Sequence, residues 1–294
     1  MGTASQRVVV ITGASSGIGR ETARLFASQG AAVVLAARGE QALHTTAEQV
    51  TRAGGTALVV PTDVAVWPQV QHLAHAALER FGRIDVWVNN AAVSGYGELN
   101  TLPVEAIDRI LDVDLRGQVY GVKAVLPILR EQGHGTIIGV SSRLGVRAVP
   151  LMVPYCIAKA GVNALYEGLR LEERHAKSGV RVTTILPASI DTPFYDSAAS
   201  WMGVRPARQQ RTEPDQGQSN LTAPAAGSGA VDGGVVRFAL PRSQWTRLVG
   251  FHPALARGAA VAATGAFGWR LAHRRPVRSA EGNYDARPRS SRRR

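Results

Sequence analysis

The sequence is poor in cysteine, because Cys156 is the only one among 294 residues. A single cysteine excludes an intrachain disulfide and a cysteine-rich metal site. The seven histidines form no evident metal-binding pattern with acidic residues. We therefore expect no metal centre, and we expect Cys156 to be a buried helical thiol.

The sequence also lacks the apolar segments that direct a chain into or across a membrane. An uncharged stretch near the C-terminus, residues 258–269, has only 12 residues and contains three glycines. A helix that crosses a bilayer needs about 20 apolar residues, which excludes a span here. A helix predicted over residues 253–273 could still lie on a membrane surface or pack against a neighbouring subunit. Residues 1–7 are too short and polar for a signal peptide, so we expect a cytoplasmic protein.

Lysine is scarce, and arginine carries most of the positive charge. Of 34 basic residues only Lys123, Lys159 and Lys177 are lysines, and the formal net charge is +12. Half of that charge lies in residues 273–294, where eight arginines outnumber two acidic residues. Such a tail suits a polyanion, but it lacks the interleaved aromatic residues of a nucleic-acid reader. We favour a solvated, disordered terminus that reflects the arginine-rich composition, and we expect no nucleic-acid partner.

A glycine-rich turn follows the first apolar run. Residues 8–11 are β-branched, as in a strand buried on both faces, and they lead into TGASSGIG at residues 12–19. Glycines at such a turn let the backbone approach a pyrophosphate. The N-terminus of the next helix, predicted over residues 21–29, then favours the negative charge. The turn indicates a dinucleotide site, although by itself it is also typical of an ordinary tight strand–helix connection.

The end of the second predicted strand indicates which dinucleotide is preferred. Residues 32–36 are followed by Ala37 and Arg38, with no carboxylate at the strand end. In dinucleotide-binding folds a carboxylate here holds the ribose 2′-hydroxyl, whereas an arginine accommodates a 2′-phosphate. Arg38 therefore favours NADP(H), and the nearby Glu40 keeps NAD(H) open as the alternative.

Three residues in the middle of the chain have the spacing of a proton-transfer site. Tyr155 and Lys159 are four residues apart and would share one face of a helix that follows Ser142. A phenol with a pKa of about 10 is a poor base near neutral pH, and a nearby ammonium lowers that pKa by stabilising the phenolate. Ser142 would hold a substrate oxygen beside the phenol. This set is suited to moving a proton while a hydride moves at the adjacent carbon.

Together these motifs resemble a short-chain dehydrogenase/reductase of the compact, single-domain type. TGASSGIG matches the family pattern TGxxxGxG, and Ser142 with Tyr155 and Lys159 matches its Ser…YxxxK active site. Residues 89–92 are similar to the NNAG element, and residues 187–192 resemble the PG…T segment, each with alanine in place of a glycine. The resemblance covers roughly the first two-thirds of the chain. The extended relatives, epimerases and dehydratases, fit less well because they space their glycines as TGxxGxxG.

The resemblance implies which residues hold the cofactor. Asp63 and Val64 would lie beside the adenine, and the segment that ends at Thr192 would contact the nicotinamide amide. Lys159 would bind the ribose and also lower the pKa of Tyr155. The residues assigned to the cofactor are Gly13, Ser15, Ser16, Gly17, Ile18, Gly19, Arg38, Asp63, Val64, Asn90, Ala91, Tyr155, Lys159, Pro187, Ile190 and Thr192.

One position departs from the family pattern. The family carries Asn in a helical segment that resembles residues 113–117, where this chain has Asp114. In the family, the backbone carbonyl of this segment helps to hold a water on the proton route to the lysine. Asp has nearly the shape of Asn but lacks its NH₂ donors. We place Asp114 with Ser142, Tyr155 and Lys159 among the catalytic residues, and we expect reduced activity or a shifted pH profile.

Apolar strand-like runs alternate with helical stretches along the chain. This order predicts an α/β fold with a doubly wound parallel sheet, Rossmann-like, in a single domain with an irregular C-terminal extension. A length of 294 residues with 45% hydrophobic composition suffices for one large core. The substrate cleft should lie at the carboxyl ends of the strands. The predicted strands are residues 8–12, 32–36, 57–60, 84–89, 136–141 and 180–186.

The sequence after Phe194 is irregular. Residues 205–229 are rich in Gln, Pro, Gly, Ser and Arg, which is typical of a mobile loop, and we assign residues 194–229 to a variable substrate lid. Residues 244–249 are predicted to form a last strand of the sheet. We place the catalytic domain in residues 1–250, and a C-terminal helix and basic tail in residues 251–294.

These features predict an NADP(H)-dependent oxidoreductase that interconverts a ketone or aldehyde and an alcohol. Apolar residues within 144–153 indicate a wall for an apolar substrate, although the same residues would also suit a plain core. From the resemblance we expect a homodimer or homotetramer, built partly on the helix that carries Tyr155. The alternative function is a dinucleotide-binding protein with little turnover, acting through a partner or a polyanion bound by the basic tail. Turnover that depends on Tyr155 separates the two.

Overall fold

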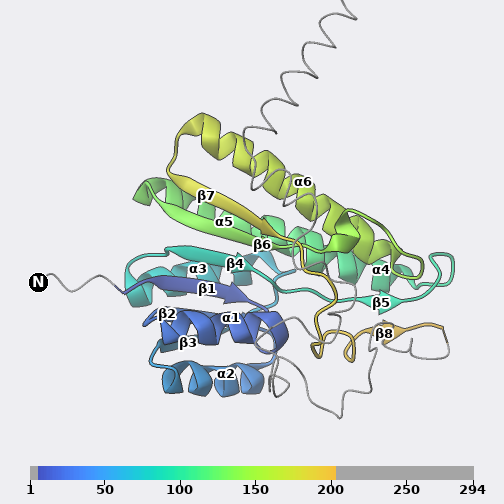
Figure 1. Ribbon diagram of the computed structural model, residues 1–294, viewed down its shortest axis with the longest axis horizontal. Helices are drawn as coiled ribbons and strands as arrows, with labels where there is room; N and C mark the ends of the chain where they lie inside the picture. The colour runs from blue at the N-terminus through green and yellow to red at the C-terminus, as the bar shows by residue number, and fades with distance from the viewer. Residues whose placement is uncertain (1–5, 203–294) are drawn as a thin grey trace, which may run out of the picture. The chain divides into compact units, whose positions relative to one another are not determined.

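The computed structural model describes residues 6–202, and six of its strands form one parallel sheet in the order β3-β2-β1-β4-β6-β7 (Figure 1). All six agree with the predicted strands to within two residues, and the predicted fold class is confirmed. β-branched and other apolar residues form the central strands because both faces of a parallel sheet are covered. The strands are β1 (Val8–Thr12), β2 (Ala32–Ala37), β3 (Thr56–Pro61), β4 (Val86–Asn89), β6 (Gly135–Val140) and β7 (Val180–Ile185).

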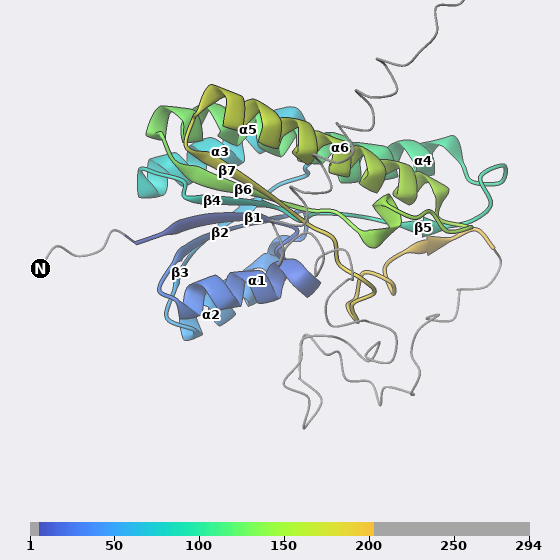
Figure 2. The ribbon, with the colours of Figure 1, turned by 45° about the horizontal axis from the view of Figure 1, so that its top comes forward.

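Helices cover both faces of the sheet. α1 (Gly17–Ser28) and α2 (Glu40–Arg52) lie on one face, and α3 (Trp67–Phe81), α5 (Gly117–Gln132) and α6 (Val153–Ala176) lie on the other (Figure 2). The chain first builds outward from β1 to β3 and then returns to β4 beside β1. Right-handed crossovers in opposite directions place their helices on opposite faces. The reversal between β1 and β4 leaves a crevice at the carboxyl ends of the strands, where α/β folds bind ligands.

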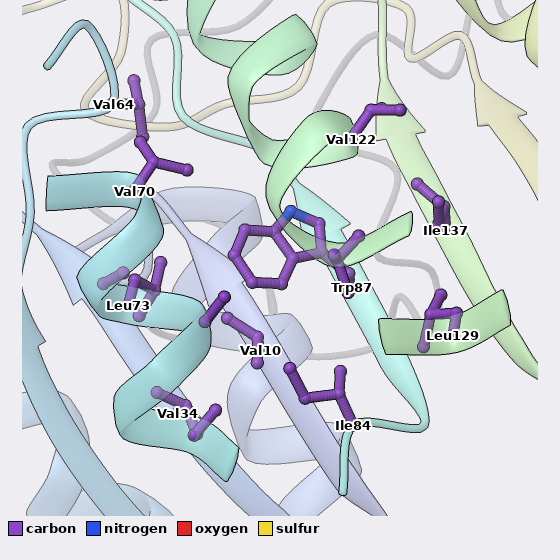
Figure 3. Packing of buried hydrophobic residues seen from close by; sticks show 14 of the residues in the cluster. Val10, Val34, Val64, Val70, Leu73, Ile84, Trp87, Val122, Leu129 and Ile137 are labelled. Carbon is purple, nitrogen blue, oxygen red and sulfur yellow. The ribbon is translucent and has the colours of Figure 1, made fainter. Parts of the chain in front are cut away.

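The core follows from the alternation of side chains along the strands. Val9 and Ile11 of β1 pack toward α1 and α2, whereas Val8 and Val10 pack toward the other helical layer. Trp87 of β4 is fully buried in that second layer, among the apolar residues drawn in Figure 3. Burial of each large apolar side chain contributes about 1.5–3 kcal/mol, so these contacts fix the strand order that positions the crevice.

The helix after β1 begins earlier than the sequence indicated. We predicted residues 21–29, but α1 starts at Gly17. The physical reason is that Gly19 is required inside the first helical turn, where a Cβ atom would overlap the Gly13 carbonyl oxygen. Glycine usually weakens a helix, which is why the pattern suggested a later start.

Short elements lie between the main layers. α4 (Val104–Leu111) continues through a π-helical segment (Asp112–Arg116) directly into α5. A 3₁₀ turn (Arg143–Gly145) follows β6. β5 (Gly95–Tyr96) pairs in parallel with β8 (Ala199–Ser200), which lies within the predicted lid. Neither the π-helical segment nor this small second sheet was expected from the sequence.

Several predictions fall on parts of the chain that the structure does not describe. The strand over residues 244–249, the helix over residues 253–273, the basic tail and residues 203–229 of the lid lie outside the described residues. Within residues 6–202, no helix is long and apolar enough to cross a bilayer.

Candidate active site

The glycine-rich turn between β1 and α1 has the backbone that a phosphate cradle requires. Gly13 and Gly17 have φ of +68° and +53°, in the left-handed region that residues with a Cβ rarely adopt. Gly19 lets α1 pack directly on the carbonyl of Gly13. The turn therefore brings the N-terminus of α1, with its positive dipole end, to the carboxyl edge of the sheet.

Side chains from α1 and α2 hold the backbone of this turn in place through hydrogen bonds. Arg20 of α1 donates to the Ser15 carbonyl and, through Nε, to the Thr46 hydroxyl at 3.2 Å. Thr46 of α2 donates in turn to the Ala14 carbonyl at 3.1 Å. The backbone of the cradle is thus preorganised by contacts within the protein.

Hydrogen bonds also join the ends of β1 and β4. The Thr12 hydroxyl accepts from the backbone N–H groups of Asn90 and Ala91 at 3.0 and 3.1 Å. The Asn90 side chain donates to the carbonyls of Thr12 and Gly13 at 3.0 and 3.2 Å. These bonds fix the width of the crevice at the point where the strand order reverses.

Charged side chains gather beyond the ends of β2 and β3. Arg38 is exposed directly after β2, and Asp63 follows β3. The Asp63 carboxylate accepts from the Ala65 N–H at 3.0 Å and from Arg109 of α4 at 2.8 Å. Burial acts to raise the pKa of Asp63, but these bonds and the charges of Arg109 and Arg38 outweigh it and hold the pKa below its usual value. Asp63 is therefore an anion between two arginines.

Ser142, Tyr155 and Lys159 meet where β6 ends against α6. Their exposed fractions are only 9%, 8% and 1%. Ser142 precedes the 3₁₀ turn, and its hydroxyl accepts from the Leu144 N–H at 3.1 Å. Tyr155 and Lys159 share a face of α6, with Lys159 Nζ 5.4 Å from the centre of the Tyr155 ring. The spacing predicted this juxtaposition of a hydroxyl, a phenol and an ammonium.

Burial dominates the ionisation of these groups. It raises the pKa of Tyr155 well above that of a free phenol, the charge of Asp114 raises it further, and a hydrogen bond with Ser142 acts in the opposite direction. Burial lowers the pKa of Lys159, and the charge of Asp114 opposes this effect. Tyr155 is therefore held as a phenol, and a phenolate would need additional positive charge nearby.

Asp114 is completely buried behind these residues, at 0% exposure. It belongs to the π-helical segment, a distortion that often marks functional sites in helices. Its Oδ1 accepts from the Val93 N–H at 2.7 Å, and its Oδ2 lies 3.6 Å from Lys159 Nζ. Asp114 therefore forms a buried ion pair with the ammonium of the site.

The ammonium is also fixed from the side of the sheet. Lys159 Nζ donates to the Val140 carbonyl at 3.3 Å, and Gln118 Nε2 donates to the same carbonyl at 3.1 Å. Gln118 accepts from the Tyr166 hydroxyl at 2.8 Å, and that hydroxyl accepts from Asn89 at 2.9 Å. This buried chain of hydrogen bonds connects the end of β4 to the position of Lys159.

The segment after β7 lies over the other side of the site. The Pro187 carbonyl accepts from the Arg143 N–H at 3.1 Å, which holds the segment beside Ser142. The Phe194 ring lies 5.8 Å from the Tyr155 ring and 5.5 Å from the Tyr195 ring, centre to centre. An aromatic wall therefore flanks the phenol.

The glycine-rich turn, the charged side chains beyond β2 and β3, the Ser142–Tyr155–Lys159 group and the aromatic wall line one cavity of about 550 Å³. It runs from the glycine-rich turn and Arg38 to Ser142, Tyr155 and Lys159. Of the residues predicted for the site, all except Gly19 and Asp114 line the cavity, and those two lie behind its wall. The structure thus brings the predicted residues together in one place.

Comparison with known proteins agrees with this geometry. A family model described as short chain dehydrogenase matches residues 7–203, which is more than half of the chain. The chain belongs to the short-chain dehydrogenase family. Family membership places it among the oxidoreductases that act on CH–OH groups with NAD(P). Among curated relatives, the uncharacterized oxidoreductase YxnA of Bacillus subtilis (strain 168) is 40% identical over 202 residues, which make up 68% of this chain but only 57% of YxnA.

Solved structures of short-chain dehydrogenases share the fold. A short-chain dehydrogenase/reductase from Burkholderia phymatum, in complex with NAD, is 35% identical with a TM-score of 0.64, covering 75% of this chain and 77% of that chain. An alcohol dehydrogenase from the archaeon Thermococcus sibiricus, complexed with 5-hydroxy-NADP, is 31% identical with a TM-score of 0.61, covering 66% of this chain and 81% of that chain. Both types of dinucleotide therefore occur among the structural neighbours.

Among the cavity-lining residues that sequence reasoning did not assign to the site of this short-chain dehydrogenase are Arg109, Phe194 and Tyr195. Phe194 and Tyr195 line the cavity, but they follow the last recognised motif in a region without periodicity. Arg109 lines it and binds Asp63, yet one arginine in an arginine-rich chain gives no signal. The role of Thr12 could have been found, since it opens the TGASSGIG motif at the strand end.

Proposed function

We propose that the protein is an NADP(H)-dependent oxidoreductase that interconverts a ketone or aldehyde and an alcohol. The observation that carries this proposal is the single cavity with a phosphate cradle at one end and Ser142, Tyr155 and Lys159 at the other. A bound nicotinamide would supply or accept the hydride. The residues of the chain would bind, orient and protonate the substrate oxygen.

The cradle fits a dinucleotide. Gly13 and Gly17 line the cavity without side chains of their own, so phosphates could contact backbone N–H groups at the start of α1. Asp63 at the far end is an acceptor for an exocyclic amine. Lys159 would hold ribose hydroxyls, as the family resemblance implies.

Arg38 supports the preference for NADP(H). It lines the cavity directly after β2, where a guanidinium can pair with a 2′-phosphate. Glu40, the residue that kept NAD(H) open, does not line the cavity. Its side chain is 67% exposed and lies 3.7 Å from His44 on the outer face of α2. The acidic residue is therefore not placed to hold a ribose 2′-hydroxyl.

The proton step follows from the positions of Ser142 and Tyr155. Ser142 would donate a hydrogen bond to the substrate oxygen and hold it beside the phenol. In the direction of reduction Tyr155 gives its proton to that oxygen, and in oxidation it takes the proton back. The Lys159 ammonium, 5.4 Å from the phenol ring, stabilises the phenolate that reduction leaves behind.

The surroundings of Tyr155 support an apolar substrate. Tyr155 belongs to an apolar cluster with Ile110, Met152 and Cys156, and Phe194 packs against it. Phe194 and Tyr195 present aromatic rings to the cavity. A cyclic or otherwise bulky ketone would bury apolar surface there, whereas a small polar carbonyl would gain little.

We propose further that the protein works in the cytoplasm as a homodimer or homotetramer. α6, which carries Tyr155, has Ile157 and Leu171 exposed at 51% and 59% on its outer side. Exposed apolar residues on a helix that otherwise packs on the core are typical of a subunit contact.

The decisive experiment measures NADPH consumption with a panel of aliphatic, cyclic and steroid-like ketones. Tyr155→Phe removes the proton donor, so we expect kcat to fall by about 10²–10⁴-fold while NADPH binding, followed by fluorescence, is retained. Tyr120→Phe is the matched control, since Tyr120 packs against Trp67 and does not line the cavity. Its kcat should stay within about threefold of the wild type.

Two outcomes would contradict the proposal. One is a Tyr155→Phe variant that turns over ketones as fast as the wild type. The other is a wild type that binds NADPH but turns over nothing on the panel. The second outcome would favour the alternative, a dinucleotide-binding protein with little turnover.

A further inference from the structure

Asp114 places a negative charge next to the catalytic ammonium, and nothing in the proposed reaction requires it. The side chain is at 0% exposure, and Oδ1 is satisfied by the Val93 N–H at 2.7 Å. Among the described residues Oδ2 has no hydrogen-bond partner, and it faces Lys159 Nζ at 3.6 Å. A buried carboxylate with one free oxygen is costly to keep unless its charge acts on a neighbour.

The titratable groups that interact electrostatically with this carboxylate come from two helices. α6 contributes Lys159 and Tyr155, and α4 contributes Arg109 at longer range. Tyr195 and Cys156 act on Tyr155 but carry no positive charge. Lys159 is therefore the cation whose charge Asp114 neutralises directly. The charges of both residues act on the pKa of Tyr155.

Burial raises the pKa of Asp114 to about 6, and the opposing charge of Lys159 keeps it from rising further. Asp114 is accordingly charged at neutral pH and becomes neutral below about pH 6. The same charge acts to raise the pKa of Tyr155. A neutral pair beside the phenol stabilises a phenolate less than a lone ammonium would.

We propose that Asp114 is a positioning residue that sets the acidity of Tyr155 through Lys159, holding Tyr155 as a proton donor to higher pH and so favouring reduction at neutral pH. This inference rests on the proposed function. It assigns the side chain of Asp114 a role, separate from any role of its backbone carbonyl. Oxidation, which needs the phenolate, is shifted by the same charge to more alkaline pH.

Asp114→Asn isolates the charge, because Asn has the same shape and its amide oxygen can still accept from the Val93 N–H. In the variant Lys159 Nζ keeps its hydrogen bond to the Val140 carbonyl at 3.3 Å. Asp114→Glu keeps the charge but lengthens the side chain. If charge is what matters, Asp114→Glu should resemble the wild type in its pH profile more than Asp114→Asn does.

The test follows the phenolate of Tyr155 by ultraviolet absorbance during a pH titration, with oxidised cofactor bound in every sample. The chain has six tyrosines, so each spectrum is taken as a difference against the same protein carrying Tyr155→Phe. We expect the phenolate to appear at least about one pH unit lower in Asp114→Asn than in the wild type, a tenfold change in acidity. The oxidation rate should rise at correspondingly lower pH, and the reduction profiles of the two proteins should converge below about pH 6.

A phenolate that appears at the same or a higher pH in Asp114→Asn would overturn the inference. The titration needs no turnover, so it decides the role of Asp114 even if no ketone on the panel is reduced. Conversely, ketone reduction could depend on Tyr155 while the phenolate appears at the same pH in Asp114→Asn and in the wild type. That result would support the proposed function and contradict only the role proposed for Asp114. If Asp114→Asn changes the stability of the protein but leaves the pH profiles of oxidation and reduction unchanged, the role of Asp114 is purely structural.

Discussion

We propose that the choice of dinucleotide depends on Arg38. It is exposed at the rim of the cavity, and its charge acts on Asp63 without forming a direct ion pair with it. A 2′-phosphate would therefore meet a guanidinium that is free to turn toward it. Hydrogen bonds to charged groups contribute about 1.5–3 kcal/mol each, which corresponds to roughly 10–100-fold in affinity.

We predict that Arg38→Ala weakens NADPH binding by about 10–100-fold and leaves NADH binding within about threefold. Fluorescence titration of both cofactors measures the two effects. Arg52→Ala is the matched control, because Arg52 pairs with Glu48 on the exposed face of α2 at 3.0 Å, away from the cavity. Equal losses for NADPH and NADH would show that Arg38 contributes only general positive charge.

At the scale of the residue, site residues could be identified from the sequence where the backbone conformation or the proposed reaction strongly favours one residue type. Glycine is favoured at the positive φ of Gly13 and Gly17, and a phenol with a nearby ammonium suits the proposed proton step. Arg109 was not predictable, because it reaches Asp63 across 46 positions through the packing of α4. The contact between Asp114 and Lys159 was likewise invisible, although the substitution itself marked the position. The functional roles of these residues remain predictions that the experiments above test.

At the scale of the element, an ion pair joins α5 to α6 at the end remote from the cavity. Arg130 Nε donates to Glu173 Oε2 at 3.1 Å, and the Glu173 side chain is only 1% exposed. The hydrogen bond from Arg130 is the main cause that lowers the pKa of Glu173. A depressed folded-state pKa contributes stability that is present above the unfolded pKa of about 4.3 and is lost as pH falls through the folded value.

We predict that Arg130→Met lowers the free energy of unfolding by about 2 kcal/mol at pH 7, because it leaves a buried carboxylate without its cation. The figure is at the low end for buried pairs, since half of the Arg130 side chain is exposed and screened. Urea unfolding at several pH values measures it, and the difference from wild type should narrow below about pH 4. Arg52→Met serves as control with an effect below about 0.5 kcal/mol. A difference that does not change with pH would mean that packing, not charge, is lost.

The main elements were predictable because their apolar runs are long and locally consistent. The short ones were not. β5 and β8 have two residues each and pair across about a hundred positions, and the Trp201 N–H donates to the Tyr96 carbonyl at 2.8 Å only once that pairing exists. The π-helical segment has an ordinary helical sequence, and its extra width depends on packing against α6. Both features lie near the site, so the detailed geometry of the cavity depends on tertiary packing and could not be predicted from the local sequence.

At the scale of the whole molecule, the outer face of α6 is unusually apolar. Its exposed positions between residues 157 and 171 repeat with helical spacing, and Glu167 is the one charged residue among them; exposed charges follow only near the end of the helix, at Glu172 and Arg174. Those positions are Ile157, Ala160, Ala164, Glu167 and Leu171. A helix face that meets only water is normally rich in charge. Small alanines between larger apolar residues would instead let a second helix approach closely.

We predict that the protein is a homodimer or homotetramer in solution and that Leu171→Glu shifts it toward smaller species. A carboxylate in the middle of an apolar contact would lose its hydration without gaining a cation, and across a two-fold axis it would also meet its own copy. We expect the dissociation constant to rise by about 100-fold or more, measured by light scattering over a dilution series. Leu25→Glu is a close control, since Leu25 is a leucine on α1 exposed at 62%, against 59% for Leu171, and lies outside this face. A monomeric wild type, or equal effects of the two substitutions, would contradict the prediction. α6 also carries Tyr155 and Lys159, so dissociation can affect turnover. If dissociation lowers turnover but does not change its pH profile, assembly stabilises the helix, and the proton step depends only on residues within one chain.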